Sequence, residues 1–451
     1  MVMVVALIVA GSGPVDAELV AAIKRGDAYR DAYLYTSADY EYHLALDRYP
    51  GNPILLLRLC EVSLKRELID EAAAFADQAE RVGADVVDVA ECRARAAESS
   101  GQGDRAAQQW AIVTNAHPTD RDARVRLIEA HIDAHNWVTA TQIAQTMFDA
   151  GPDDETAAYL LGSLFILDDA GQARLILRGA QADALIAALD EPASRVNTAY
   201  RAVAVGRVFL ERDQLALAWR AFLEATASNP NYSDGFAYLG LTYDALGDAT
   251  LAAAFLDRAL EINRNSAVAL YLRGVYASRH GQWTNAQADL ERAAQIDPGN
   301  ASIAIALGRV LAEQGEYAQA AEHMGKAATL DPNDVEWQLA LAELHIGRLI
   351  DVNAKGVPAA RRAVELAPLD ARAHAWLGWG LYLSGDAAQA EAELLTALRL
   401  DPVSARARLF LGNLYVNTGR IEDGRTELQR AVDLDPQGEV GARARTLLGG
   451  Q

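Results

Sequence analysis

Apolar and small residues recur along residues 199–438 in a pattern of about 34 residues that occurs seven times. In the copy at 405–438, apolar residues three and four positions apart form one stripe before Gly419 and a second stripe after it. This spacing predicts two amphipathic helices, and the glycine predicts the turn between them. The region therefore predicts seven helical hairpins. They begin at Ala199, Ser233, Ala267, Ala301, Val335, Ala371 and Ala405.

The eighth position of each copy is a small residue, usually glycine, although glycine inside a helix costs up to about 1 kcal/mol relative to alanine. We infer that the paired helix approaches closely there, because it carries a small residue of its own at the facing position. The eighth positions are Gly206, Gly240, Gly274, Gly308, Ala342, Gly378 and Gly412. The facing positions are Ala218, Ala252, Ala286, Ala320, Ala390 and Gly424.

The end of each copy follows a second fixed pattern. An alanine at the twenty-seventh position leaves room for the next hairpin, and a proline ends the second helix in every copy except the one with Arg264. Polar residues such as Ser266, Asp334 and Ser404 follow, and their side chains are suited to cap the next helix. The copy at 335–370 carries two inserted residues.

Period, two-helix unit and signature residues together resemble the tetratricopeptide repeat. The resemblance is carried by positions such as Leu239, Gly240, Tyr243, Ala252 and Ala259, and it recurs in all seven copies. It implies an all-α fold, a right-handed superhelical solenoid of antiparallel helix pairs. Such a solenoid grows by stacking repeats on a continuous core, so the length of 451 residues does not imply several globular domains.

The rest of the chain fits the same 34-residue spacing less well. Residues 16–154 predict four divergent repeats, because Gly26 keeps the eighth position in the first one whereas Cys60, Ala94 and Ile128 replace it in the others. Residues 155–198 exceed one period by ten and predict an irregular junction repeat with a short extra helix near 182–189. Residues 439–451 predict a capping helix and tail that follow the regular units at 199–438.

Residues 1–15 form an apolar N-terminal segment that opens with the run Met1–Ala10. The run is shorter than the roughly 20 residues that span a bilayer, and it lacks the basic residues that open a secretory signal. It can be a trimmed signal or anchor, a helix packed on the first repeat, or a tail. We favour the first interpretation, which predicts association with the cell envelope rather than a cytoplasmic location.

The charge and the cysteines limit the possible ligands. The net charge of −21, from 62 acidic and 41 basic residues, argues against nucleic acid as a partner. A membrane is expected to be contacted only through residues 1–15. Two cysteines exclude a disulfide framework and a thiolate metal cage. We expect Cys60 and Cys92 to be buried small side chains, and a bridge between adjacent first helices is the alternative.

No phosphate loop, dinucleotide fingerprint, zincin signature or nucleophile elbow occurs in the sequence. His131 and His135 lie four residues apart, a spacing that suits a metal, but His135 falls at the predicted turn, so that we expect a surface pair. We therefore predict no catalytic residues, no metal and no cofactor.

The resemblance also implies where a partner binds. In tetratricopeptide arrays the first helix of each hairpin lines a concave groove through its second, fifth, ninth, twelfth and thirteenth positions. Aromatic, arginine and amide side chains at these positions suit an extended peptide. The alternative is that the aromatic rings are stacking residues and the arginines only solvate the surface. The groove residues are Arg207, Tyr271, Arg279, Arg309, Arg372, Trp379, Tyr382, Arg406, Asn413 and Asn417.

These observations predict a non-catalytic scaffold that binds a protein or peptide in its groove, with assembly of an envelope complex as the finer hypothesis. The lysine and asparagine clamp of chaperone-binding members is missing, because Leu57 with Glu61 and Ala375 with Trp379 occupy its positions. A regulatory subunit of an enzyme complex and a self-assembling structural rod are the alternatives. The sequence does not indicate the oligomeric state or the partner's identity.

Overall fold

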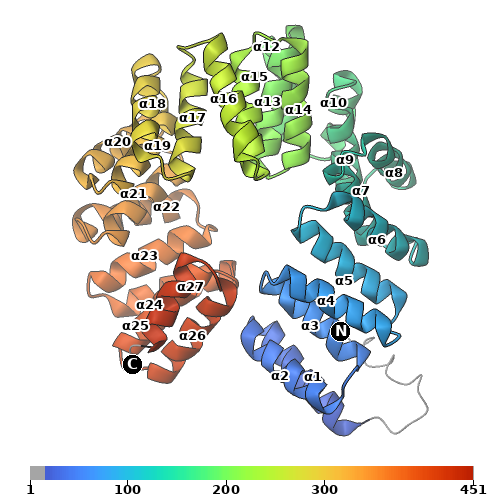
Figure 1. Ribbon diagram of the computed structural model, residues 1–451. Helices are drawn as coiled ribbons and strands as arrows, with labels where there is room; N and C mark the ends of the chain where they lie inside the picture. The colour runs from blue at the N-terminus through green and yellow to red at the C-terminus, as the bar shows by residue number, and fades with distance from the viewer. Residues whose placement is uncertain (1–15, 450–451) are drawn as a thin grey trace. The chain divides into compact units, whose positions relative to one another are not determined.

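The computed structural model describes residues 16–449, and within that range it contains α-helices, one π-helix and no strand (Figure 1). The first helices are α1 (Ala17–Asp31), α2 (Tyr35–Arg48), α3 (Pro53–Lys65), α4 (Ile69–Arg81), α5 (Val86–Ser99), α6 (Gly103–Ala116), α7 (Arg121–Asp133) and α8 (Trp137–Ala150). They are followed by α9 (Glu155–Phe165), α10 (Ala170–Gly179), α11 (Asp183–Asp190) and α12 (Pro192–Val196).

The regular repeats begin with α13 (Thr198–Glu211), α14 (Leu215–Ser228), α15 (Ser233–Ala245), α16 (Ala249–Ile262), α17 (Ala267–Arg279), α18 (Trp283–Ile296), α19 (Ala301–Glu313) and α20 (Tyr317–Leu330). The last elements are α21 (Val335–Gly347), the π-helix η2 (Val352–Gly356), α22 (Val357–Leu366), α23 (Ala371–Leu383), α24 (Ala387–Leu400), α25 (Ala405–Asn417), α26 (Ile421–Leu434) and α27 (Glu439–Gly449). The all-α fold of paired helices is confirmed.

The two helices of a hairpin approach closely at the glycine of the eighth position. A Cβ atom at Gly240 would lie 2.8 Å from Leu256 Cγ and 3.0 Å from the backbone oxygen of Ala252. Gly274 and Gly308 face the second helices of their own hairpins in the same way. The close approach that the sequence predicts is therefore present, and a long side chain one turn beyond the small residue fills the remaining space.

The two inserted residues of the copy at 335–370 lengthen the connection between α21 and α22. The connection contains η2, and Leu349 and Asp351 adopt positive φ values of 57° and 49° before it. Gly356, at the end of η2, packs so closely on Ile346 that a Cβ atom would lie 2.7 Å from Ile346 Cγ1. The insertion is thus absorbed at the turn, and the stacking of the following hairpins continues.

A disulfide joins Cys60 of α3 to Cys92 of α5, with the two Cα atoms 6.5 Å apart. The expectation of two unlinked thiols is therefore wrong, and the bridge that was its alternative is present. The sulfur atoms can meet because neighbouring first helices pack side by side and bring the eighth position of one repeat close to the next helix. Both residues belong to one buried cluster with Ala72 and Ala76.

Between the divergent and the regular repeats, the junction contains α9 to α12. The short helix α11 lies where the sequence predicts an extra helix. Leu175 of α10 and Val196 of α12 leave 70% and 87% of their side chains exposed, whereas Leu185 of α11 is fully buried. Helices α10 and α12 therefore each leave one large apolar side chain exposed.

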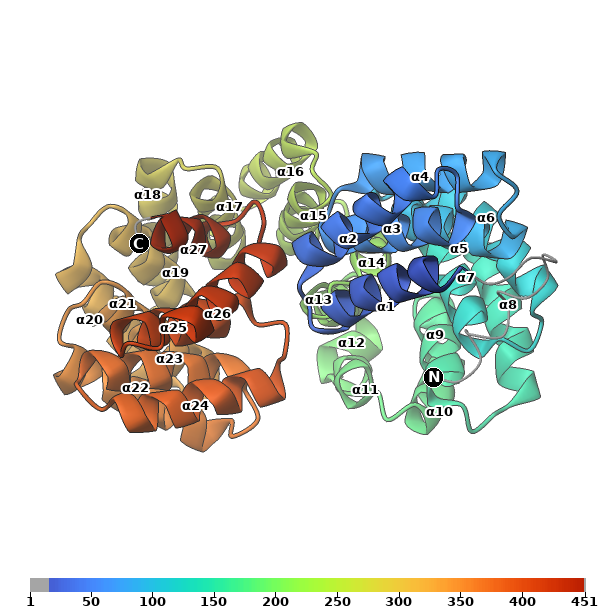
Figure 2. The same ribbon diagram turned by 90° about the horizontal axis from the view of Figure 1, so that it is seen from below.

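The described residues divide into two compact units. Unit 1 contains the helices up to Ala130 together with those from Glu391 onward, and unit 2 contains residues His131–Ala390. In unit 1, α27 packs against α25 and α26 (Figure 2). Leu434 of α26 also packs on the cluster of Tyr35 and Tyr42 in α2. Each unit is thus built from stacked hairpins around its own buried clusters.

Candidate functional site

A basic and aromatic surface lies on the first helices of unit 2. We call it the arginine–tyrosine face, and it consists of Arg207 of α13, Tyr238 of α15, Tyr271 and Arg279 of α17, and Arg309 of α19. The three arginine side chains are exposed, and the two tyrosines are half-buried in the cluster that joins α15 to α17. The repeat period brings these residues together, because each occupies the same surface of successive first helices.

The charges on this face are only partly neutralised. Among residues 16–449, neither Arg207 nor Arg309 forms an ion pair, whereas Arg279 lies 3.1 Å from Asp244. The guanidinium of Arg207 lies 5.9 Å from the centre of the Tyr238 ring, a cation–π distance. Burial raises the pKa of Tyr271, and the positive charges of Arg309, Arg279 and Arg207 oppose that rise. The face therefore offers positive charge beside tyrosine rings.

The predicted groove residues of α23 are engaged in contacts within the protein. Arg372 pairs with Asp370 at 2.7 Å and donates to Glu336 Oε2 at 3.1 Å. Trp379 is 7% exposed, and its ring stacks on Tyr382 with the ring centres 5.1 Å apart. Burial and packing account for Trp379, and neighbouring carboxylates neutralise Arg372.

The remaining predicted groove residues lie on α25, which belongs to unit 1. Arg406 and Asn413 are half-buried, and Asn417 is exposed. The amide of Asn417 donates to the backbone oxygen of Asn413 at 2.9 Å.

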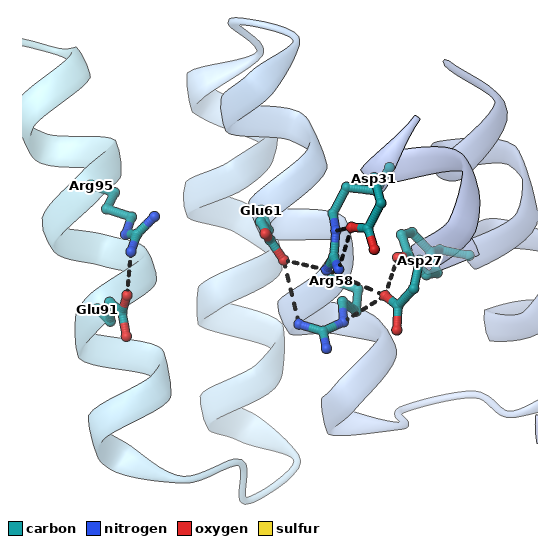
Figure 3. A network of polar contacts seen from close by, with 8 residues as sticks. Asp27, Asp31, Arg58, Glu61, Glu91 and Arg95 are labelled. Carbon is teal, nitrogen blue, oxygen red and sulfur yellow. Dashed lines mark hydrogen bonds and ion pairs between the residues drawn. The ribbon is translucent and has the colours of Figure 1, made fainter. Parts of the chain in front are cut away.

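The first helices of unit 1 carry a network of charged side chains that position-by-position reasoning missed (Figure 3). Arg58 of α3 lies 3.0 Å from Asp27 and 3.4 Å from Glu61, and Arg30 of α1 donates to Glu61 at 3.0 Å. Tyr42 also donates to Asp27, at 2.6 Å. Burial, followed by this hydrogen bond, raises the pKa of Tyr42. The network ties α1, α2 and α3 together.

Tyr238 was likewise missed, because it occupies the sixth position of its repeat, which the groove rule omits. Its ring stacks on Phe222 with centres 5.2 Å apart and lies 5.9 Å from the guanidinium carbon of Arg207. The available signal was the occurrence of tyrosine near the middle of two successive first helices, at Tyr238 and Tyr271.

Of the histidine pair at 131 and 135, His135 packs against aromatic side chains. The ring of His135 stacks on Trp219 and Trp137, with centres 4.4 and 5.5 Å apart. No group of three or more His, Cys, Asp or Glu side chains arranged to hold a metal ion occurs in residues 16–449. The arrangement around His135 is accounted for by stacking.

The proposed N-terminal signal or anchor lies at residues 1–15, outside the described residues. Over the part of the chain that the structure describes, none of the helices has the length and apolar character needed to cross a bilayer.

Family comparison assigns the repeats. Two family models, both described as Tetratricopeptide repeat, match the sequence, one over residues 277–344 and the other over residues 204–267 and 380–439. These matches fall within the region where the period is regular. No curated protein matches the sequence.

Several solved structures have similar helix arrangements. Yeast Tom70 is 17% identical, with 96% of each chain covered and a TM-score of 0.43. Cut9, from the APC/C hetero-tetramer Cut9-Hcn1, is 15% identical, with 96% of this chain and 89% of the other covered and a TM-score of 0.46. Pseudomonas aeruginosa pilF is 20% identical, with 48% of this chain and 97% of the other covered and a TM-score of 0.41. These likenesses concern the fold alone.

Proposed function

The chain belongs to the tetratricopeptide repeat family, and we propose that it is a non-catalytic scaffold that holds a partner protein or peptide on the arginine–tyrosine face of unit 2. The repeats support a role in protein interaction, and no catalytic family is indicated. The observation that carries the proposal is the pair of exposed arginines, Arg207 and Arg309, which lack ion-pair partners within residues 16–449 and lie beside half-buried tyrosine rings.

This combination favours a partner segment with carboxylate side chains. Guanidinium groups bind carboxylates through two parallel hydrogen bonds, and tyrosine rings supply rigid apolar contact at little cost in conformational entropy. The face would also repel a basic segment, because Arg207 and Arg309 carry like charge and form no ion pair among the described residues. We therefore expect an acidic, extended segment to run across α13, α15, α17 and α19.

The test is affinity capture from native lysate followed by purification of the captured partner and measurement of its Kd. The double variant Arg207→Ala with Arg309→Ala is expected to raise the Kd about 10- to 100-fold, because two charge-assisted contacts are lost. The control is Arg258→Ala with Arg292→Ala, which makes the same change in net charge on the second helices α16 and α18. Equal Kd values for the two double variants would rule out the face as the binding surface.

A finer form of this proposal is assembly of a complex at the bacterial envelope. It is supported only by the apolar run Met1–Ala10, which lies outside the described residues. Fractionation of cells that express the chain with and without residues 1–15 tests it. An unchanged distribution between membrane and soluble fractions would contradict this finer form and leave the scaffold proposal intact.

A further inference from the structure

Unit 1 contains a cavity of about 810 Å³ between the first helices of the first three hairpins. Its apolar lining comes from α1, α3 and the loop before α5, and the Cys60–Cys92 disulfide contributes to the wall. Such a volume lies in the range of roughly 300–1,000 Å³ that is usual for ligand sites, so that it admits more than one side chain. The apolar lining residues are Val20, Ile23, Pro53, Ile54, Leu57 and Leu64.

Most of these apolar side chains are half-buried and keep a surface toward the cavity. Ile54, Leu57 and Leu64 are half-buried, although they lie on a helix whose opposite side, with Leu55 and Leu59, is fully buried. Ile54, Leu57 and Leu64 also pack on the buried clusters of unit 1. The part of each side chain that this packing leaves uncovered lines the cavity.

The charges around the cavity differ from one side to the other. On the α1 and α3 side, Arg58 neutralises Asp27 and Glu61 (Figure 3). On α5, Glu91 is paired with Arg95 at 2.5 Å.

Two carboxylates, those of Asp85 and Asp88, lie near the start of α5. Asp85 and Asp88 are exposed, and neither forms an ion pair among the described residues. Asp85 caps the helix by accepting from the backbone N–H of Val87 at 2.8 Å. Partial burial, followed by the negative charges of Asp85 and Glu91, raises the pKa of Asp88, and the positive charges of Arg58 and His117 oppose that rise. A cation placed beside Asp85 and Asp88 would relieve this crowding of negative charge.

We propose that this cavity binds a partner segment whose apolar side chains fill it and whose lysine or arginine side chain pairs with Asp85 and Asp88. The charges around the cavity also orient the bound segment. Lys24 on α1 lines the cavity, is exposed and would repel a basic group, so that the basic end of the segment is expected to lie beside α5. An acidic segment is disfavoured by two carboxylates that form no ion pair among the described residues. This second site lies in another unit and has the opposite charge preference from the arginine–tyrosine face.

A selection of random 12-residue peptides displayed against the full-length chain tests the composition of the ligand. We expect enrichment of peptides with adjacent Leu, Ile, Val or Met residues and a flanking Lys or Arg. One enriched peptide is then synthesised with a fluorescent label, together with a form in which the basic residues are Gln and a form in which the apolar residues are Ser. Each altered form is expected to bind at least about 10-fold more weakly.

Variants of the protein locate the peptide. Asp85→Asn with Asp88→Asn is expected to weaken binding of the selected peptide about 10-fold or more, and asparagine keeps the cap of α5 intact. Asp70→Asn with Glu71→Gln on α4 makes the same change in net charge away from the cavity and serves as the control. Arg207→Ala with Arg309→Ala is expected to leave this binding unchanged, which separates the second site from the arginine–tyrosine face.

A photo-crosslinking residue at position 57 identifies the occupant directly. Crosslinking to the labelled peptide would support the proposal. Crosslinking to residues 1–15 of the same chain or to a second copy would overturn it, as would enrichment of acidic peptides or an unchanged Kd in the Asp85 and Asp88 double variant.

Discussion

At the scale of single residues, two glycines inside helices differ in their surroundings. Gly240 lies against the backbone of α16, whereas Gly325, in the middle of α20, has open space where a side chain would be. Both are helical, so both carry the entropic cost of glycine in a helix. Only the first has a packing reason to be glycine.

Gly240→Ala is expected to destabilise the protein by about 1–2 kcal/mol, because the overpacking of Leu256 and the Ala252 carbonyl exceeds the gain in helix propensity. Gly325→Ala is the matched control and is expected to stabilise by up to about 1 kcal/mol. The measurement is the urea midpoint at constant m-value. If both variants shift the midpoint in the same direction, the close approach of α15 and α16 does not explain the glycine.

At the scale of elements, the insertion between α21 and α22 depends on one buried histidine. His345 is 3% exposed, and its Nδ1 lies 3.1 Å from the backbone oxygen of Ile350, so that the Nδ1–H tautomer donates to the inserted turn. Burial lowers the pKa of His345. Burial therefore favours the neutral imidazole, and its hydrogen bond to Ile350 stabilises the connection that precedes η2.

The free energy of unfolding is expected to fall as the pH drops below about 6.5, because His345 then binds a proton in the unfolded chain but not in the folded protein. The contribution is fully present above the unfolded pKa and amounts to at most about 1.4 kcal/mol for each unit by which the pKa is lowered. His345→Gln keeps a donor and does not titrate. Urea unfolding at pH 7.5 and 5.5 should show a larger loss for the parent chain than for the variant. Equal losses would exclude His345 as the titrating group.

Most of the fold could be predicted from the sequence, because a period that occurs seven times specifies the helices, the turn and the stacking of every copy. The site was harder to predict, since position in the repeat gives a residue's surface but not its neutralising partners. Arg372 and Glu336 both occupy second positions and pair across successive repeats, 36 residues apart. The disulfide was equally undetermined, because helix packing distance decides whether Cys60 and Cys92 meet.

At the scale of the whole molecule, we expect the junction of α10, α11 and α12 to be the least stable part of unit 2. Helices α11 and α12 are shorter than those of the regular repeats, and α10 and α12 expose the large apolar side chains of Leu175 and Val196. In repeat arrays the stability of a hairpin depends on its immediate neighbours, so an irregular repeat opens more readily than a regular one.

Hydrogen exchange followed by mass spectrometry should therefore show α11 and α12 exchanging at least about 10-fold faster than α15 and α17. Peptides from α15 to α18 provide the internal reference, because they belong to the regular hairpins of the same unit. Protection in the junction equal to that of the reference peptides would show that irregular length does not weaken the array.

The Cys60–Cys92 disulfide also sets how the chain responds to tension. A force applied to the two ends passes through the sulfur–sulfur bond and bypasses the 32-residue span between the cysteines. At about 3.4 Å per residue, roughly 110 Å of extended chain stays slack until the bond is reduced. The second hairpin therefore carries no load across its turn, and the α3–α5 segment behaves as an inextensible link in an otherwise extensible array.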